Sequence, residues 1–183
     1  MARDRLPSRL FSARPAQALR VRNTTLAALA IALAACEPAY PPPPAFRAFH
    51  GLPVSGSLAD ARRAGFTRCA RDARSTLRCT RSDVRIAGLG PYHAALDLKG
   101  GNGRGGFDRL TVWYNGDQYE LLRVGEALKQ AGWHACYTGQ GQKGDQAIYT
   151  RPDATVRVAI DLSYWMKRRL RLFREDDPRK PHC

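Results

Sequence analysis

Downstream of the first 35 residues, the densest positive charge lies near the C-terminus, in a segment that also holds aromatic residues. Arginine binds carboxylate and phosphate groups through paired hydrogen bonds, and a neighbouring aromatic ring adds a further contact surface. The segment is therefore a candidate surface for an anionic glycolipid or cell-wall polymer. The alternative is a solvated edge strand, on which positive charge prevents pairing with another sheet. Its basic residues are Lys167, Arg168, Arg169 and Arg171, with Tyr164 and Trp165 beside them.

Two aspartates are a second candidate for chemistry. Asp97 and Asp161 occupy matching places in two similar stretches of sequence, and glycoside hydrolysis and acid–base catalysis use paired carboxylates. The alternative is that nearby arginines form cross-strand ion pairs with them on the solvated face. We favour this alternative and expect no catalytic residue in the chain.

A histidine and a cysteine form a third candidate. His134 lies two residues before Cys136, so on a strand both side chains would point to the same face. Such a pair could activate a thiolate or hold a metal ion. The interpretation we favour is a disulfide at Cys136 with an incidental histidine, and we expect no metal and no cofactor.

The cysteines downstream of Cys36 predict disulfides. There are four of them, and an even number is typical of an exported protein. Cys69 and Cys79 lie on opposite arms of a predicted hairpin, where they can face each other at a distance that a disulfide closes. By elimination, Cys136 pairs with Cys183 or stays free.

The first 35 residues have the pattern of an export signal. Six arginines and one acid precede an apolar run that starts at Leu26 and ends in Leu33-Ala34-Ala35-Cys36. A basic leader, a short apolar stretch and small residues before a cleavage site are typical of a secretory signal. The apolar run is shorter than the roughly 20 residues of a membrane-spanning helix. Cleavage at an Ala-x-Ala pattern, without lipid, is the second alternative.

The motif Leu-Ala-Ala-Cys resembles the lipobox of bacterial lipoproteins. The resemblance implies that the leader, residues 1–35, is removed, and that Cys36 receives a diacylglycerol and an acylated amino terminus. The chain would then be attached to a membrane, as its partner, through this lipid anchor. Among Gram-negative lipoproteins an aspartate after the cysteine marks retention at the inner membrane. Glu37 in that place implies the outer membrane, with the chain facing the periplasm.

The net charge of the chain restricts its partners. The leader holds six of the 30 basic residues and one of the 16 acidic ones, which leaves residues 36–183 with a net charge of +9. A basic domain often binds nucleic acid, but export removes that partner, and phospholipid, cell wall and anionic glycolipid take its place. The alternative is that scattered arginines are simply solvated.

Composition divides the exported part into three segments. Residues 36–56 are predicted to be a linker, because consecutive prolines after Cys36 form a semi-rigid polyproline spacer. Residues 57–175 are expected to form the folded domain. Residues 176–183 are expected to be a C-terminal tail.

Similar stretches within the domain predict an internal duplication into units 57–115 and 116–175. In each unit a helix is predicted to end at a glycine, Gly65 or Gly132, which takes the left-handed turn without a clash. Alternating apolar and polar residues, clearest between 156 and 172, predict strands with one face on the core, with Arg168 as the exception on the apolar side. Chance similarity in a chain rich in alanine and arginine is the alternative.

We therefore expect an α+β fold of two tandem helix-plus-antiparallel-meander units, with the helices packed on one side of the sheet. The element order from Ser57 to Phe173 loosely resembles small secreted modules such as β-lactamase inhibitor protein or PepSY-type domains. This resemblance implies a shape and no activity.

The expected function is that of a non-enzymatic, membrane-anchored envelope lipoprotein with a binding or scaffolding domain. The alternative is an inhibitor-like module that acts on a secreted protein. That alternative requires an exposed aromatic patch, for which the candidates are Trp113, Tyr114, Trp133 and Trp165.

Overall fold

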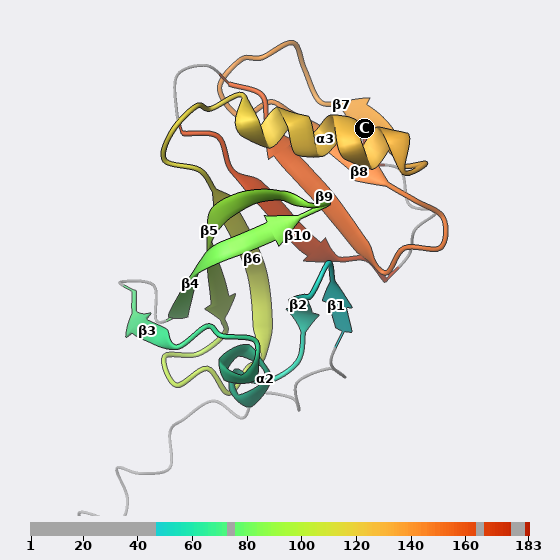
Figure 1. Cartoon of the computed structure of the whole chain (residues 1–183). Coiled ribbons are helices and arrows are strands. Elements are labelled where there is room, and N and C mark those ends of the chain that lie inside the picture. The colour runs from blue at the N-terminus through green and yellow to red at the C-terminus, as the bar shows by residue number, and fades with distance from the viewer. Residues whose placement is uncertain (1–46, 73–75, 164–166, 177–181) are drawn as a thin grey trace, which may run out of the picture. The chain divides into compact units, whose positions relative to one another are not determined.

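A computed structural model describes residues 47–72, 76–163, 167–176 and 182–183. These residues form ten strands and two helices (Figure 1). In chain order the elements are β1 (Arg47–Phe49), β2 (Leu52–Ser55), α2 (Leu58–Arg63), β3 (Arg68–Arg71), β4 (Leu77–Ile86), β5 (Leu89–Leu98), β6 (Phe107–Trp113), α3 (Glu120–Gln130), β7 (His134–Tyr137), β8 (Gln146–Thr150), β9 (Val156–Asp161) and β10 (Leu170–Arg174).

Eight of the strands form one antiparallel sheet in the order β3-β4-β5-β6-β10-β9-β8-β7. Strands β3 to β6 follow one another as a meander, and so do β7 to β10. The two meanders join where β10 pairs with β6, with Leu170 opposite Val112. The remaining two strands, β1 and β2, form a separate hairpin.

The predicted α+β fold of two helix-plus-meander units, with helices on one side of the sheet, is wrong. The protein is mostly β, with an eight-stranded sheet, a two-stranded sheet and only two helices among the described residues. Two features explain why strands predominate over helices. β4 and β5 are each ten residues long, and α2 is only six. The pairing of β6 with β10 also merges the two meanders into one sheet.

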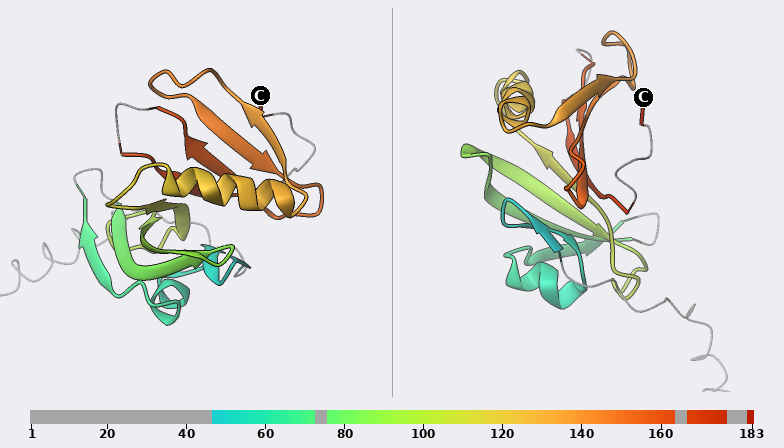
Figure 2. Two further views of the ribbon diagram at one scale, coloured as in Figure 1. Left: turned by 45° about the horizontal axis from the view of Figure 1, so that its top comes forward. Right: turned by 90° about the vertical axis from the view of Figure 1, so that its right-hand side faces the viewer.

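Alternation along the strands separates an inner face, on the core, from an outer face. In β5 the even-numbered residues from Tyr92 to Leu98 belong to the core cluster, whereas Asp97 points to the outer face. α3 adds Leu121, Val124 and Leu128 to the same core, and β2 adds Leu52. Viewed from the side, α3 lies on one side of strands β7 to β10 and the C-terminus on the other (Figure 2).

The predicted alternation between residues 156 and 172 is confirmed for the described part. Val156, Val158 and Ile160 in β9 are buried, as are Leu170 and Leu172 in β10. Tyr164 and Met166 lie outside the described residues.

Both predicted helix stops are also confirmed. Gly65 and Gly132 follow the helices with φ angles of 85° and 82°, a backbone conformation that only glycine adopts without strain. Each is followed by a buried aromatic residue, Phe66 or Trp133, and then by a strand. α2 begins at a capping box, in which Ser57 and Asp60 exchange hydrogen bonds.

Two disulfides fasten the sheet. Cys69 pairs with Cys79 across β3 and β4, as predicted, and their Cα atoms are 4.0 Å apart. Cys136 pairs with Cys183, which decides between the two alternatives left open for these cysteines. The second disulfide ties the C-terminal residue to the edge strand β7.

Several predictions fall outside the described residues, namely the leader at 1–35, the lipid-bearing Cys36 and the proline run after it. The hairpin of β1 and β2 lies inside the range 36–56 that was expected to be a linker, and Leu52 and Val54 belong to the core. Neither helix of the described chain is long and apolar enough to cross a membrane.

Candidate anion-binding groove

A groove of about 380 Å³ lies on the outer face of the sheet. Its floor is a row of residues paired across neighbouring strands, in which Thr80 lies opposite Ala95 and Ala95 opposite Thr111. The same row continues to β10, where Arg171 lies opposite Thr111. The floor is low because alanine and threonine are short, so the longer side chains of adjacent rows rise around it.

The walls of the groove are cationic. Five of its nine lining residues are basic, namely Arg78, Arg109, Lys167, Arg169 and Arg171, and none is acidic. They come from β4, β6 and β10 and from the residues just before β10. Their convergence is a product of the β6–β10 pairing, which brings the basic C-terminal segment beside the first meander.

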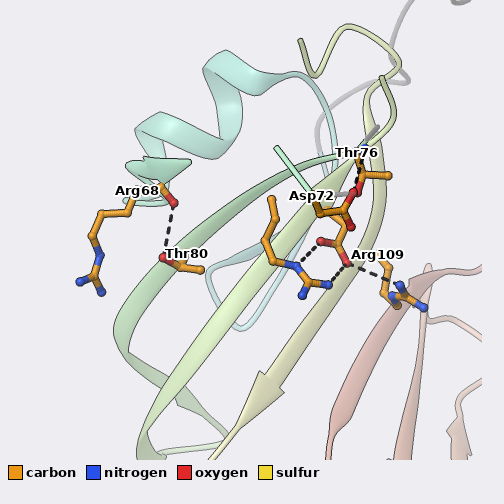
Figure 3. Close-up of polar contacts among 7 residues, drawn as sticks. Arg68, Asp72, Thr76, Thr80 and Arg109 are labelled. Carbon is orange, nitrogen blue, oxygen red and sulfur yellow. Dashed lines mark hydrogen bonds and ion pairs between the residues drawn. The ribbon is translucent and has the colours of Figure 1, made fainter. Parts of the chain in front are cut away.

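Asp97 holds two of these arginines in place. Its side chain is 3% exposed and accepts hydrogen bonds of 2.6 Å and 2.9 Å from Nε and Nη2 of Arg78. Nη2 of Arg109 is 3.5 Å from Oδ2 of the same carboxylate, the oxygen that also accepts from Nη2 of Arg78. Figure 3 shows Arg109 and Thr80 on two different strands of this face. The hydrogen bond to Asp97 raises the pKa of Arg78, so its charge is permanent.

One donor of Arg109, its Nε atom, is buried without a hydrogen-bond partner among the described residues. A buried donor of this kind costs free energy until it finds an acceptor.

Asp161 is likewise bound to its neighbours. Its Oδ1 accepts a hydrogen bond from Nη1 of Arg171 and one of 3.1 Å from Nε2 of Gln146. β6 and β10 lie between the strands of Asp97 and Asp161, which separates the two strands by about 14 Å across the sheet. The register adds an offset along the strands, because the row of Asp97 meets β9 at Arg157, four residues before Asp161. Glycosidase carboxylates are about 5–9.5 Å apart, so the two aspartates do not form a catalytic pair.

The predicted basic segment divides between the two sides of the sheet. Lys167, Arg169 and Arg171 line the groove, but Arg168 is only 3% exposed and does not share that surface. Its guanidinium donates to the backbone carbonyls of Gln118 and Leu162 at 3.2 Å and 3.3 Å. It also lies 4.8 Å from the ring of Tyr119. Arg168 is therefore a structural residue.

Trp113 forms an aromatic side of the groove. The guanidinium of Arg169 lies 5.4 Å from its ring, and the imidazole of His93 stacks on it at 5.7 Å. The ring thus orients Arg169 through a cation–π contact. Arg169 and Lys167 are cations of the groove that no carboxylate of the described chain contacts.

The remaining candidates do not assemble into a reactive site. Cys136 is held in its disulfide, so it offers no thiolate, and His134 is exposed. No cluster of three metal-ligating side chains occurs in the described part of the chain. Of the aromatic residues proposed for an inhibitor patch, Trp133 is 5% exposed, Trp113 and Tyr114 are half-buried, and Trp165 lies outside the described residues.

Sequence reasoning missed the part of the groove that lies on the first meander. Arg109, Thr111 and Trp113 alternate with the buried Leu110 and Val112. That alternation was a usable signal, because it puts the three larger polar and aromatic residues on one face of a strand. The pairing of this strand with the C-terminal strand had no comparable signal.

Comparison with known protein families, curated proteins and solved structures finds no match to this chain.

Proposed function

We propose that this chain is a non-enzymatic, membrane-anchored lipoprotein of the cell envelope, whose sheet binds an anionic ligand in the groove. The observation that carries the binding proposal is the lining itself, with five cations, no acid and one aromatic ring. Guanidinium groups bind phosphate and carboxylate oxygens in pairs, so such a lining selects anions.

The partner we propose is an anionic cell-envelope polymer or glycolipid, and no nucleic acid. The net charge of +9 in residues 36–183 would attract such a partner over a distance, and the groove would hold it. The hydroxyl of Thr111 on the floor adds an uncharged hydrogen-bond donor.

The location we propose is the periplasmic side of the outer membrane, to which a lipid on Cys36 attaches the chain. The motif Leu33-Ala34-Ala35-Cys36 supports the anchor. The two disulfides are consistent with it, because disulfides persist in oxidising compartments outside the cytoplasm.

A binding role is favoured over catalysis, because both candidate carboxylates are engaged in hydrogen bonds and ion pairs. Asp97 is engaged by Arg78 and Arg109, and Asp161 by Arg171 and Gln146, so neither is free to act as acid or base. The inhibitor alternative has less support, because Trp133 is buried and cannot contribute to an exposed aromatic patch.

The anchor is tested by intact mass and membrane fractionation of the native protein beside a Cys36→Ser variant. We expect the wild type in the membrane fraction, at the mass of residues 36–183 plus acyl chains, and the variant in the soluble fraction. Wild type and variant both in the soluble fraction would overturn the anchor.

Anion binding is tested by isothermal titration calorimetry with inorganic triphosphate, on protein purified in a nonionic detergent. The variant is Lys167→Gln with Arg169→Gln, which removes two charges that no carboxylate of the described chain neutralises. The matched control is Arg47→Gln with Arg62→Gln, which removes two exposed charges away from the groove.

We expect the groove variant to lose at least about tenfold in affinity, because a hydrogen bond to a charged group contributes about 1.5–3 kcal/mol. The control should bind like the wild type. Equal binding by all three proteins would remove the groove as the site. No binding by the wild type would overturn the proposed anion-binding function.

A further inference from the structure

The groove continues toward the edge strand β3. A second hollow of about 410 Å³ lies beside it and shares Arg78 and Thr80 with it. Arg68 and Arg71 add two more cations there, and Arg71 is exposed. The one acid in this lining, Asp72, accepts a hydrogen bond of 3.1 Å from the backbone N–H of Thr76 (Figure 3).

A single row of paired residues connects the two hollows. Arg68 lies opposite Thr80, and from Thr80 the row runs through Ala95 and Thr111 to Arg171. The row crosses five adjacent strands, which are four strand spacings, or about 19 Å. It has arginine at each end and short side chains between them.

The basic surface continues past Arg171 and then ends where the C-terminal residues cover the sheet. A third hollow of about 210 Å³ shares Arg171 with the groove and adds Lys143, together with Asp161, which is paired with Arg171. Beyond it, the outer face of the second meander carries the C-terminal residues, because Cys183 is bonded to Cys136 and His182 Nε2 is 2.8 Å from Glu175. The open basic surface therefore runs from β3 to β10 and its neighbour β9.

We propose that the ligand of the groove is a linear polyanion that lies across the strands from β3 to β10. We refer to the row of Arg68, Thr80, Ala95, Thr111 and Arg171, with the cations that flank it, as the basic track. A single small anion fills one part of the track and leaves the charges at the other end unpaired. A chain of repeating anionic groups pairs with cations along the whole length.

This inference rests on the proposed function and extends it to the class of ligand. The track reaches the edge strand β3, so a polymer longer than the track can continue past that end of the sheet. Charge also favours it, since affinity for a polyanion grows with each cation that displaces a counterion from the chain.

The test compares inorganic triphosphate with long-chain polyphosphate on the purified protein in nonionic detergent, with affinity expressed per phosphate group. Three variants are used. Arg68→Gln with Arg71→Gln removes the β3 end of the track, the corresponding double lysine variant keeps its charge, and Arg47→Gln with Arg62→Gln is the control.

We expect the wild type to bind the long chain at least about tenfold more tightly per phosphate, with a steeper loss of affinity as salt rises. The glutamine variant should lose that advantage and still bind triphosphate like the wild type. The lysine variant should retain most of the advantage, and the control should retain all of it.

The outcomes separate the two proposals. If triphosphate binds in the groove but the long chain has no advantage, or the β3-end variant keeps it, the polyanion inference is overturned and the proposed function stands. If neither probe binds the wild type, both are overturned.

Discussion

Replacing Asp97 by asparagine tests how the groove is built. The substitution keeps the shape of the side chain and removes its charge. In the native protein this carboxylate is 3% exposed and accepts two hydrogen bonds from Arg78, with Arg109 at 3.5 Å. Without the charge, two guanidinium groups lose their common partner on the same face of the sheet.

The size of the effect follows from the exposure of the partners. Removing one member of a fully buried ion pair costs about 3–5 kcal/mol. The side chains of Arg78 and Arg109 are 47% and 36% exposed, so water hydrates them after the carboxylate is gone. We therefore expect a loss of about 2 kcal/mol, within the range of a single charge-assisted hydrogen bond. At about 4 °C per kcal/mol, the melting temperature falls by about 8 °C.

Thermal unfolding followed by circular dichroism, with the disulfides oxidised, measures this change in melting temperature. Asp153→Asn is the matched control, because Asp153 also pairs with an arginine but is 72% exposed. Exposed ion pairs contribute about 0–1 kcal/mol, so the control should melt near the wild-type temperature. Asp97→Asn melting together with the control would refute the role we give to this carboxylate.

Three further substitutions probe the core around the sheet. Gly125→Ala should destabilise the protein by about 1–3 kcal/mol in chemical denaturation, because a Cβ there would lie 2.1 Å from the Tyr149 hydroxyl. Burial raises the pKa of Tyr149 from 10 to about 12, because the folded protein favours the neutral phenol. The stability that the neutral phenol contributes is therefore complete below pH 10 and is lost as the pH rises from 10 to 12. Denaturation at a series of pH values should therefore show a smaller alkaline loss in Tyr149→Phe. Arg168→Gln should lower the melting temperature and leave triphosphate affinity unchanged, because Arg168 bonds Gln118 and Leu162 and lies outside the groove.

Each of these three predictions would be contradicted by a specific result. Wild-type stability in Gly125→Ala would mean that the helix does not pack on the Tyr149 hydroxyl. An alkaline loss in Tyr149→Phe equal to that of the wild type would remove this phenol as its source. Loss of triphosphate affinity in a folded Arg168→Gln protein would place Arg168 in the binding surface.

Local features of this chain were predictable because their causes are local. Gly65 and Gly132 end helices whatever surrounds them, since the left-handed turn depends on the glycine alone. The disulfide of Cys69 with Cys79 follows from a hairpin that places both on facing strands. Alternation identified the buried side of β9 and β10 for the same reason.

The fold class and the groove depend on a long-range contact. Nothing near Leu170 or Val112 in the sequence indicates that their strands pair, yet this pairing produces one eight-stranded sheet. It also brings Arg171 beside Thr111 and Arg169 onto Trp113, which creates the groove. Arg168 is buried for a similar reason, because its carbonyl acceptor at Gln118 is fifty residues away in the chain.

The most direct test of the account is a map of the arginines that an anion protects. The purified protein is treated with an arginine-selective dicarbonyl reagent, with and without triphosphate, and modification is quantified by peptide mass spectrometry. We predict that triphosphate protects Arg109, Arg169 and Arg171 and leaves Arg62 and Arg123 as reactive as before. Equal protection at the groove and control arginines, or protection at neither, would contradict the claim that this groove binds anions.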